Sequence, residues 1–349
     1  MRVFNRTLPL LALSCLCSGA GASTITSTST STSAAVSRSA KRGLAFTPNA
    51  TWPQDNYLWT RSPSDLTWYY NYGASPSPVY SNLSQDVFAF VPMLWGGSSS
   101  RTSDTTFLAT VTGLLSHGIE ISHVLTFNEP DLSTDYGGSD VDPMVAAKIW
   151  VANIIPLQAT GVKVGLPACS GGWGAVPWLS QFLGNCSKLI STDGSGGVTR
   201  NCTYDFIPLH WYGNFEGLAS HIGTYAAAFP NATFWVTEFN DNDQDLATTQ
   251  SFFNTSIEYL DRLAHVERYS FFGAFRSTAS NVGPNAAMLS AGGKLTDIGA
   301  WYLGEAATGV VPDSGTSSPA IRRPGSSGAY IRALLTPAFA CALLLVSVY

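Results

Sequence analysis

Charged side chains are scarce in this chain of 349 residues, where Asp, Glu, Lys and Arg make up 12% of the sequence. An ordinary globular protein has about twice that share, roughly 25%. Because 45% of the residues are hydrophobic, the low charge does not indicate a disordered chain, which combines low hydrophobicity with high charge. The net charge of -5 also argues against a nucleic-acid partner, which would need a basic surface.

Cysteines are few as well, and of the six only Cys169, Cys186 and Cys202 lie outside the terminal segments. Cys186 and Cys202 flank a Gly/Ser-rich loop, so a disulfide between them is the favoured pairing and Cys169 is left as a buried thiol. No C-x-x-C or H-E-x-x-H spacing occurs, so we predict no metal site. The motifs of nucleotide cofactors are missing too, and we expect no cofactor.

Both ends of the chain have the composition of processing segments. Residues 1–22 combine arginines, an apolar run and small residues, which is typical of a secretory signal peptide. Residues 23–42 form a Ser/Thr-rich spacer or propeptide that ends at Lys41-Arg42, a pair that is either a processing site or plainly solvated. Residues 311–332 are a Ser/Gly/Pro linker, and the apolar tail 333–349 favours a removed glycosylphosphatidylinositol (GPI) signal over a membrane-spanning helix.

Six N-x-[ST] sequons support an extracellular location. They are Asn49, Asn82, Asn185, Asn201, Asn231 and Asn254. We therefore expect a secreted, monomeric protein of the cell surface or cell wall, in contact with a membrane only through a GPI anchor.

The segment 43–310 alternates short apolar runs with helical patterns. The runs cover residues 43–47, 66–71, 87–93, 123–128, 162–167, 205–210, 234–238 and 268–273. Nearly continuous apolar runs are typical of parallel strands that are covered on both faces. Asp142-Pro143 supplies a helix N-cap and first residue, and Leu218, Ile222 and Tyr225 share one helix face. The eight apolar runs and the helices between them predict a single (β/α)8 TIM barrel, with a doubly wound open sheet as the alternative.

Glutamate is the scarcest acid, with seven in the chain, and two of the seven follow predicted strands directly. Glu129 ends the fourth strand and Glu238 the seventh. A carboxylate is costly to bury without a role, and barrel enzymes carry their catalytic residues at the carboxyl ends of strands. Two carboxylates that face each other are the machinery of glycoside hydrolysis. The less specific interpretation of each is a structural hydrogen-bond acceptor.

A resemblance to a known family rests on five ordered motifs. They are Trp68-Tyr-Tyr-Asn71, Val91-Pro-Met-Leu-Trp-Gly96, Phe127-Asn-Glu-Pro-Asp131, Leu209-His-Trp-Tyr212 and Trp235-Val-Thr-Glu-Phe239. Over about residues 43–305 the sequence resembles glycoside hydrolase family 128, the glucanases related to fungal alkali-sensitive-linkage proteins. The resemblance implies a retaining β-1,3-glucanase with β-glucan as its partner.

The resemblance also implies roles for single residues. Glu129 would be the acid/base and Glu238 the nucleophile, while Asn128 would bind the sugar 2-hydroxyl. Tyr212 or His210 would hold the nucleophile ionised and aimed. The sequence departs from the wider clan in the eighth strand, where Phe272 stands in place of a frequent Trp.

Aromatic side chains near strand ends are candidates for stacking on sugar rings, although packing at the edge of the core is nearly as plausible for each. We expect the substrate-binding set to comprise Trp68, Tyr70, Asn71, Trp95, Trp211 and Phe272 beside the residues named above. Of the tryptophans, Trp68, Trp95 and Trp211 are favoured because each is predicted at the carboxyl end of a strand. Trp52, Trp59, Trp173 and Trp178 are further candidates in loops.

Two other functions remain open from the sequence. A wall transglycosylase would share the glycosyl-enzyme intermediate with a hydrolase, and a β-glucan-binding wall glycoprotein would carry the same pocket without turnover. A serine hydrolase is disfavoured, because no G-x-S-x-G motif occurs.

Overall fold

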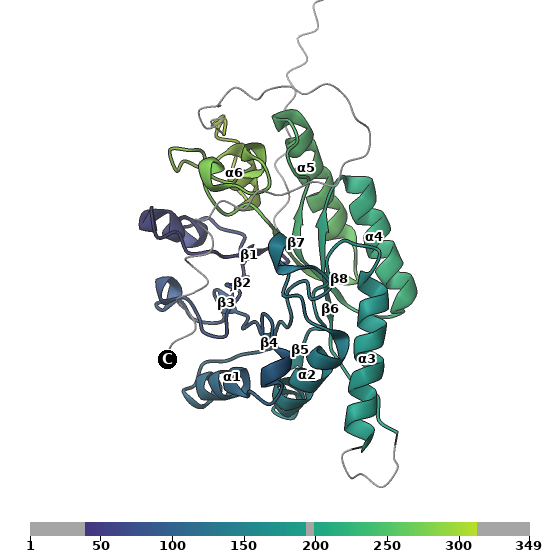
Figure 1. Ribbon diagram of the computed structural model, residues 1–349. Coiled ribbons are helices and arrows are strands. Elements are labelled where there is room, and N and C mark those ends of the chain that lie inside the picture. Colours follow the sequence, from purple (N-terminus) through teal and green to yellow (C-terminus); the bar gives the residue numbers. More distant parts are fainter. Residues whose placement is uncertain (1–38, 193–198, 313–349) are drawn as a thin grey trace, which may run out of the picture. The chain divides into compact units, whose positions relative to one another are not determined.

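Short parallel strands alternate with helices in the computed structural model, which describes residues 39–192 and 199–312 (Figure 1). The strands of this part are β1 (Gly43–Ala45), β2 (Trp68–Tyr70), β3 (Ala89–Phe90), β4 (His123–Val124), β5 (Lys163–Val164), β6 (Ile207–Tyr212), β7 (Phe234–Asn240) and β8 (Val266–Phe271). All eight predicted runs contain a strand or overlap one. The observed strands β3, β4 and β5 are shorter, because only two residues of each form a regular ladder.

The strands form three parallel sheets rather than one continuous sheet. Their orders are β1-β2-β3, β4-β5 and β6-β7-β8. Isolated parallel bridges join the sheets where the ladders stop: Met93 pairs with Leu125, Gly165 with Phe206, and Arg42 with Tyr269. Each strand segment therefore lies beside the next one along the chain, and their carboxyl ends point the same way.

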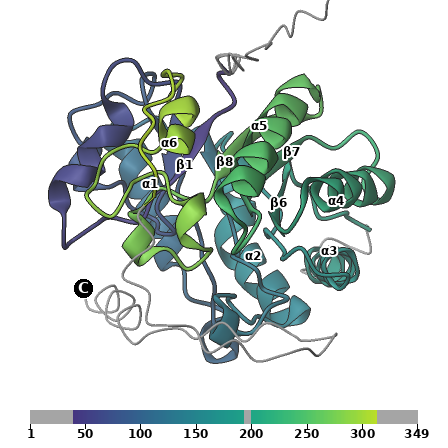
Figure 2. The same ribbon diagram turned by 90° about the horizontal axis from the view of Figure 1, so that it is seen from above.

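Helices connect the strands and cover their outer side (Figures 1 and 2). The α-helices of the described part are α1 (Thr106–Ser116), α2 (Pro143–Gln158), α3 (Ala175–Thr192), α4 (Phe215–Ala228), α5 (Leu246–Arg262) and α6 (Asp297–Tyr302). The first two connections carry 3-10 turns instead, η1 (Pro53–Thr60) and η2 (Pro78–Tyr80). The predicted cap is confirmed, since the Asp142 carboxylate accepts hydrogen bonds from the backbone N–H groups of Met144 and Val145.

Two apolar clusters follow from the alternation of side chains along a strand. Tyr69 of β2 packs in the outer cluster between strands and helices, together with the predicted helix residues Leu218, Ile222 and Tyr225. Its neighbours Trp68 and Tyr70 point the other way, into an inner cluster that Trp235 and Phe206 also join. One face of the strands thus carries an aromatic core of its own.

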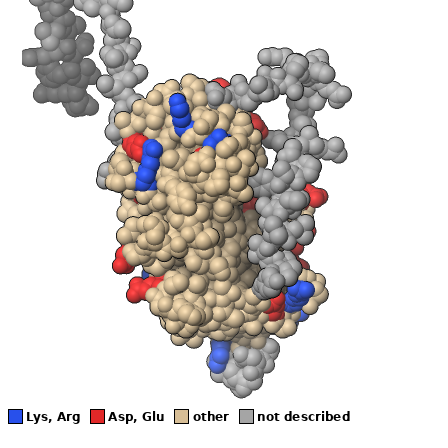
Figure 3. Space-filling model, turned by 90° about the vertical axis from the view of Figure 1, so that its left-hand side faces the viewer, with Lys and Arg blue, Asp and Glu red and all other residues tan. Residues whose placement is uncertain are grey.

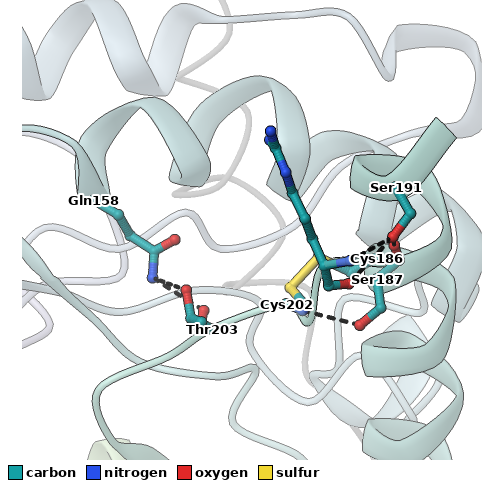
Figure 4. The surroundings of a disulfide bond; sticks show 7 residues. Gln158, Cys186, Ser187, Ser191, Cys202 and Thr203 are labelled. Atoms are coloured by element: carbon teal, nitrogen blue, oxygen red, sulfur yellow. Dashed lines mark hydrogen bonds between the residues drawn. A yellow bond between two sulfur atoms is a disulfide. The ribbon is translucent and has the colours of Figure 1, made fainter. Parts of the chain in front are cut away.

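The predicted disulfide is confirmed between Cys186 on α3 and Cys202 (Figure 4). The hydroxyl of Ser187 accepts a hydrogen bond from the backbone N–H of Cys202 at 2.9 Å. This bond holds the segment that precedes β6 against α3. Gln158 of α2 reaches the same segment and donates to the carbonyl of Thr203 at 3.0 Å. Cys169 is a buried free cysteine, as expected.

Lys41 and Arg42 belong to the folded unit and are not a solvated pair. The Lys41 ammonium donates to the carbonyls of Leu260, Asp261 and Leu263 at the end of α5, at 2.9–3.0 Å. Arg42 is fully buried. Cleavage after Arg42 stays a prediction.

The other terminal predictions lie outside the described residues: the signal peptide 1–22, the spacer up to residue 38, and the linker and tail from residue 313. Within the described ranges, no helix has both the length and the apolar character to cross a membrane. None of the six sequon asparagines is buried; Asn82, Asn201 and Asn231 are exposed. Charged side chains are sparse on the face shown in Figure 3 and leave most of it uncharged.

Candidate active site

Glu129 and Glu238 lie together, buried, at the carboxyl end of the strands. Glu129 follows β4 and is 7% exposed, and Glu238 lies in β7 and is 6% exposed. His210 of β6 links them, because its Nδ1 is 3.0 Å from Glu129 Oε1 and 3.5 Å from Glu238 Oε2. One ring nitrogen of His210 and one carboxylate oxygen of each glutamate lie within 4.8 Å of one another. The predicted pairing of the two glutamates is therefore present.

Tyrosine hydroxyls hold the carboxylate of Glu238 from both sides. Tyr212 donates to Oε2 at 2.6 Å, and Tyr72 donates to Oε1 at 2.8 Å. Tyr70 lies 3.4 Å from Oε1 and also donates to the carbonyl of Thr237 at 2.9 Å. Burial, followed by neighbouring charges that include Glu238, keeps the pKa of each of these three tyrosines well above the ordinary value. Tyr72 and Tyr212 therefore stay protonated and donate to this carboxylate, while the hydrogen of Tyr70 goes to the Thr237 carbonyl.

The electrostatics of Glu129 differ, because its strongest influence is desolvation. Burial raises the pKa of Glu129, and the nearby carboxylates of Glu238 and Asp131 add to the rise, while the hydrogen bond from His210 opposes it. Burial alone would lower the pKa of His210, but the surrounding carboxylates outweigh burial and raise it. The pair of glutamates thus consists of a carboxyl that favours its proton and a carboxylate held by donors.

The backbone is strained where the site is built. Glu129 has φ of 42° and Tyr72 has φ of 62°, the left-handed region that residues other than glycine rarely adopt. Such strain persists only where the surroundings enforce it, and it is commonest at functional sites. For Tyr72 the enforcing turn includes Asn71, whose Oδ1 accepts from the N–H of Gly73 at 3.2 Å and whose Nδ2 donates to the carbonyl of Ser75 at 3.0 Å. Asn71 thus shapes the turn that carries Tyr72.

Asn128 is also buried beside the pair. Its Nδ2 donates to the carbonyl of Gly137 at 3.2 Å, whereas its Oδ1 has no partner among the described residues. A buried acceptor without a partner is uncommon and is suited to a ligand hydroxyl. This agrees with the role expected for Asn128.

The predicted aromatic residues divide into border and core. Phe272 is half-buried and its ring lies 5.8 Å from that of Tyr212, at the border of the site. Trp95 is half-buried and packs against the inner cluster. Trp211 is half-buried too, but its ring lies 5.2 Å from that of His221 on α4, on the outer side of β6. His210 and Trp211 point to opposite sides of the strand, as neighbours must.

The prediction for Trp68 is wrong. Trp68 is the first residue of β2, not the last, because β2 begins its pairing with β1 there, Trp68 against Gly43. Its side chain is 1% exposed, lies 5.1 Å from the ring of Trp235, and donates to the carbonyl of Lys41. It fills the inner core at the amino end and has no free face for a sugar.

Sequence reasoning missed Tyr72 and Asp131. Tyr72 shares the inward side with Tyr70, two residues before it, so the alternation of the strand could have identified it. The Asp131 carboxylate accepts from the N–H and the hydroxyl of Ser170, at 2.8 and 2.7 Å. This contact is long-range and has no local sequence signal.

A cavity of about 490 Å³ lies elsewhere, lined by residues that include Tyr80, Phe88 and Glu120. Neither Glu129 nor Glu238 lines it. The chemistry of the paired carboxylates is therefore not located in this cavity.

Comparison with known proteins identifies relatives of this chain. The family described as the glycosyl hydrolase catalytic core matches residues 43–302 of this chain. Alkali-sensitive linkage protein 1 of Schizosaccharomyces pombe is 30% identical over 277 residues, which cover 76% of this chain and 45% of that protein. The chain thus spans about half the length of the curated relative it matches.

Two solved structures illustrate the range of relatives. A family 128 endo-β-1,3-glucanase of Pseudomonas viridiflava is 26% identical with a TM-score of 0.59, over 78% of this chain and 100% of that one. A family 128 oligosaccharide-binding protein of Cryptococcus neoformans is 24% identical with a TM-score of 0.55, over 78% of this chain and 95% of that one. The fold is therefore shared by enzymes and by binding proteins.

Proposed function

Since this chain belongs to glycoside hydrolase family 128, we propose that it hydrolyses β-1,3-glucan by a retaining mechanism. The observation that carries the proposal is the buried pair Glu129 and Glu238, which differ in their surroundings and share His210. Their close approach favours retention, in which the carboxyl groups are about 5–5.5 Å apart, over inversion, which needs roughly 6.5–9.5 Å.

In the first step, an oxygen of Glu238 attacks the anomeric carbon and forms a glycosyl ester. The bond from that carbon to the leaving oxygen breaks, and Glu129 gives its proton to this oxygen. The raised pKa of Glu129 supports this role, because the acid must still hold its proton when substrate binds. Tyr72 and Tyr212 position Glu238 through one hydrogen bond to each of its oxygens.

In the second step, Glu129 acts as a base. It takes a proton from water, the water oxygen attacks the anomeric carbon, and the ester bond to Glu238 breaks. Glu129 is then protonated again and Glu238 is again a carboxylate. Asn128 offers its unpaired Oδ1 to a sugar hydroxyl next to the reacting carbon.

We propose that the scaffold is a closed (β/α)8 barrel. The parallel bridges between consecutive sheets, and the bridge from Arg42 to Tyr269 that relates β1 to β8, support this arrangement. The position of both glutamates at the carboxyl end of the strands is the place where such barrels carry their active sites.

We also propose an extracellular location with a GPI anchor. The disulfide of Cys186 and Cys202 supports it, since disulfides persist mainly in oxidising compartments. Release of the protein from intact cells by a phosphatidylinositol-specific phospholipase is expected. Retention on the cells after that treatment would favour a spanning helix.

An activity screen tests the function. The wild-type protein should release reducing sugar from linear β-1,3-glucan and not from β-1,6-glucan, with mixed-linkage glucan as a third substrate. Glu129→Gln and Glu238→Gln should each lose this activity. Full activity in either variant would end the assignment.

A second candidate is a glucan-binding protein without turnover, which the similarity to the binding protein of C. neoformans favours. Binding of laminarihexaose by a wild-type protein that cleaves none of the three glucans would establish it. Products longer than the substrate, formed at high oligosaccharide concentration, would instead indicate transglycosylation.

A further inference from the structure

We propose that Trp173 forms a sugar-stacking subsite on the leaving-group side of the paired glutamates, where it binds a glucosyl unit of the departing part of a β-glucan chain. The inference rests on the proposed function, because the roles of Glu129 and Glu238 define the two sides. Trp173 is 96% exposed, far more than the other exposed large hydrophobic residues of the described ranges, which reach 61%. A large apolar ring so fully exposed to water is unusual, and such rings mark binding sites.

Trp173 lies at the carboxyl end of the strands. The last pairing between the segments of β5 and β6 joins Cys169 to Leu209, and α3 begins at Ala175. The loop 170–174 between them therefore leaves the sheet on the side where Glu129 and Glu238 lie. Glycines flank the tryptophan at positions 171, 172 and 174, so no neighbouring side chain covers its ring.

The loop is fastened to the segment that carries Glu129. The N–H of Glu129 donates to the carbonyl of Ala168 at 2.7 Å. Two residues further on, Asp131 accepts both the N–H and the hydroxyl of Ser170, which is three residues before Trp173. A side-chain carbon at Gly171 would lie 3.1 Å from the ring of Trp211. The loop thus rests on Trp211 and is tied to Asp131, so its position depends on that of Glu129.

The chemistry assigns this side to the leaving group. Glu129 gives its proton to the leaving oxygen, so the departing sugar lies next to Glu129. β5 is the hydrogen-bonded neighbour of β4, which leads into Glu129, whereas Glu238 attacks from β7. The C–H face of a glucosyl unit carries partial positive charge and fits the negative face of an indole ring. Trp173 therefore suits a neutral sugar that departs with the leaving oxygen.

The test compares two substrates of different leaving group. Laminarihexaose can place glucosyl units on Trp173, whereas an aryl β-laminaribioside has only its aryl group on that side. For Trp173→Ala, we expect the loss in kcat/KM on laminarihexaose to exceed the loss on the aryl substrate by about tenfold, or about 1.4 kcal/mol. Trp173→Phe should restore part of it. Val87→Ala, at an exposed apolar residue before β3, is the control.

Equal losses on both substrates, or none, would overturn the subsite. Binding separates this failure from a failure of the proposed function. In the Glu238→Gln background, Trp173→Ala should weaken calorimetric binding of laminarihexaose by about tenfold. If the wild-type protein cleaves neither substrate, the proposed function fails and this binding ratio alone decides the subsite: unchanged affinity overturns it.

Discussion

The two ends of the parallel strands bury charge in different ways. At the amino end, Arg42 lies 3.1 Å from Asp65 and also donates to the carbonyls of Trp301 and Tyr302. At the carboxyl end, Glu129 and Glu238 lie together, and neither has a lysine or arginine partner in the ion pairs of the described residues. Opposite charges stabilise the first end, whereas at the second end two acidic side chains are brought together with a histidine between them.

The aromatic residues follow the same division. At the amino end Trp68, Phe206 and Trp235 pack on one another, with the Arg268 guanidinium 4.4 Å from the ring centre of Trp235. At the carboxyl end, the tyrosines Tyr72 and Tyr212 donate hydrogen bonds from their hydroxyls to Glu238. The lesson is that one end of the fold uses its buried polar groups for stability, while the other uses them to place two carboxyl groups in different surroundings.

The largest expected effect is that of Glu129→Gln on activity. On unactivated glucan we expect a loss of about 10²–10⁴-fold, the usual contribution of a general acid. On a dinitrophenyl glycoside, whose leaving group needs no proton, the glycosylation step should be nearly unaffected. Burst kinetics with both substrates check this, and an equal loss on both would contradict the acid role.

The same variant should change the pH profile. The acid is active while protonated, so kcat/KM of the wild type falls as pH rises through the pKa of Glu129. Because burial raises this pKa, the fall begins at a higher pH than the ordinary value of 4.5 would give. On laminarihexaose, the residual activity of Glu129→Gln should lack this limb; an unchanged limb would assign it to another group.

At the amino end, Arg42→Met should act on stability. The substitution removes one partner of the buried pair with Asp65, which costs about 3–5 kcal/mol in the free energy of unfolding. Urea unfolding measures it. Arg61→Met is the control, because the Arg61 side chain is 44% exposed and its pair with Glu305 contributes about 0–1 kcal/mol. Equal losses in the two variants would show that the buried ion pair at the amino end stabilises the fold no more than the exposed pair does.

Tyr72→Phe should lower kcat/KM without a comparable loss of stability. A hydrogen bond to a charged group contributes about 1.5–3 kcal/mol, so we expect a loss of roughly 10–100-fold. Tyr80→Phe removes another buried hydroxyl, one that donates to the carbonyl of Asn56. This control should affect stability and leave kcat/KM alone. The reverse pattern would make Tyr72 a structural residue only.

The smallest effect is expected for Glu129→Gln on stability. A carboxyl whose folded pKa is raised binds its proton more tightly in the folded state. Its cost to stability therefore appears as pH rises above the ordinary value of 4.5 and is complete above the raised pKa. At neutral pH we expect the variant to be at least as stable as the wild type in urea unfolding. A clear loss would show that Glu129 stabilises the fold.

The sequence was sufficient for the strands and for the two glutamates. Nearly continuous apolar runs locate buried parallel strands, and a carboxylate directly after such a run stands out because burial is costly. The ends of β2 could not be predicted in this way, since its register with β1 decides that Trp68 begins the strand. The inward side of Tyr72 follows from its spacing to Tyr70, but its left-handed backbone does not. The position of the loop that carries Trp173 depends on a contact between residues 131 and 170, which is a tertiary feature.

The most direct test of the account is to trap the covalent intermediate. A 2-deoxy-2-fluoro-β-laminaribiosyl fluoride slows both steps, while its good leaving group lets the first proceed. We predict that the wild-type protein gains the mass of one fluorolaminaribiosyl group and that peptide mapping places it on Glu238. A label on another residue, or an active enzyme that gains no label and releases an inverted product, would contradict the account.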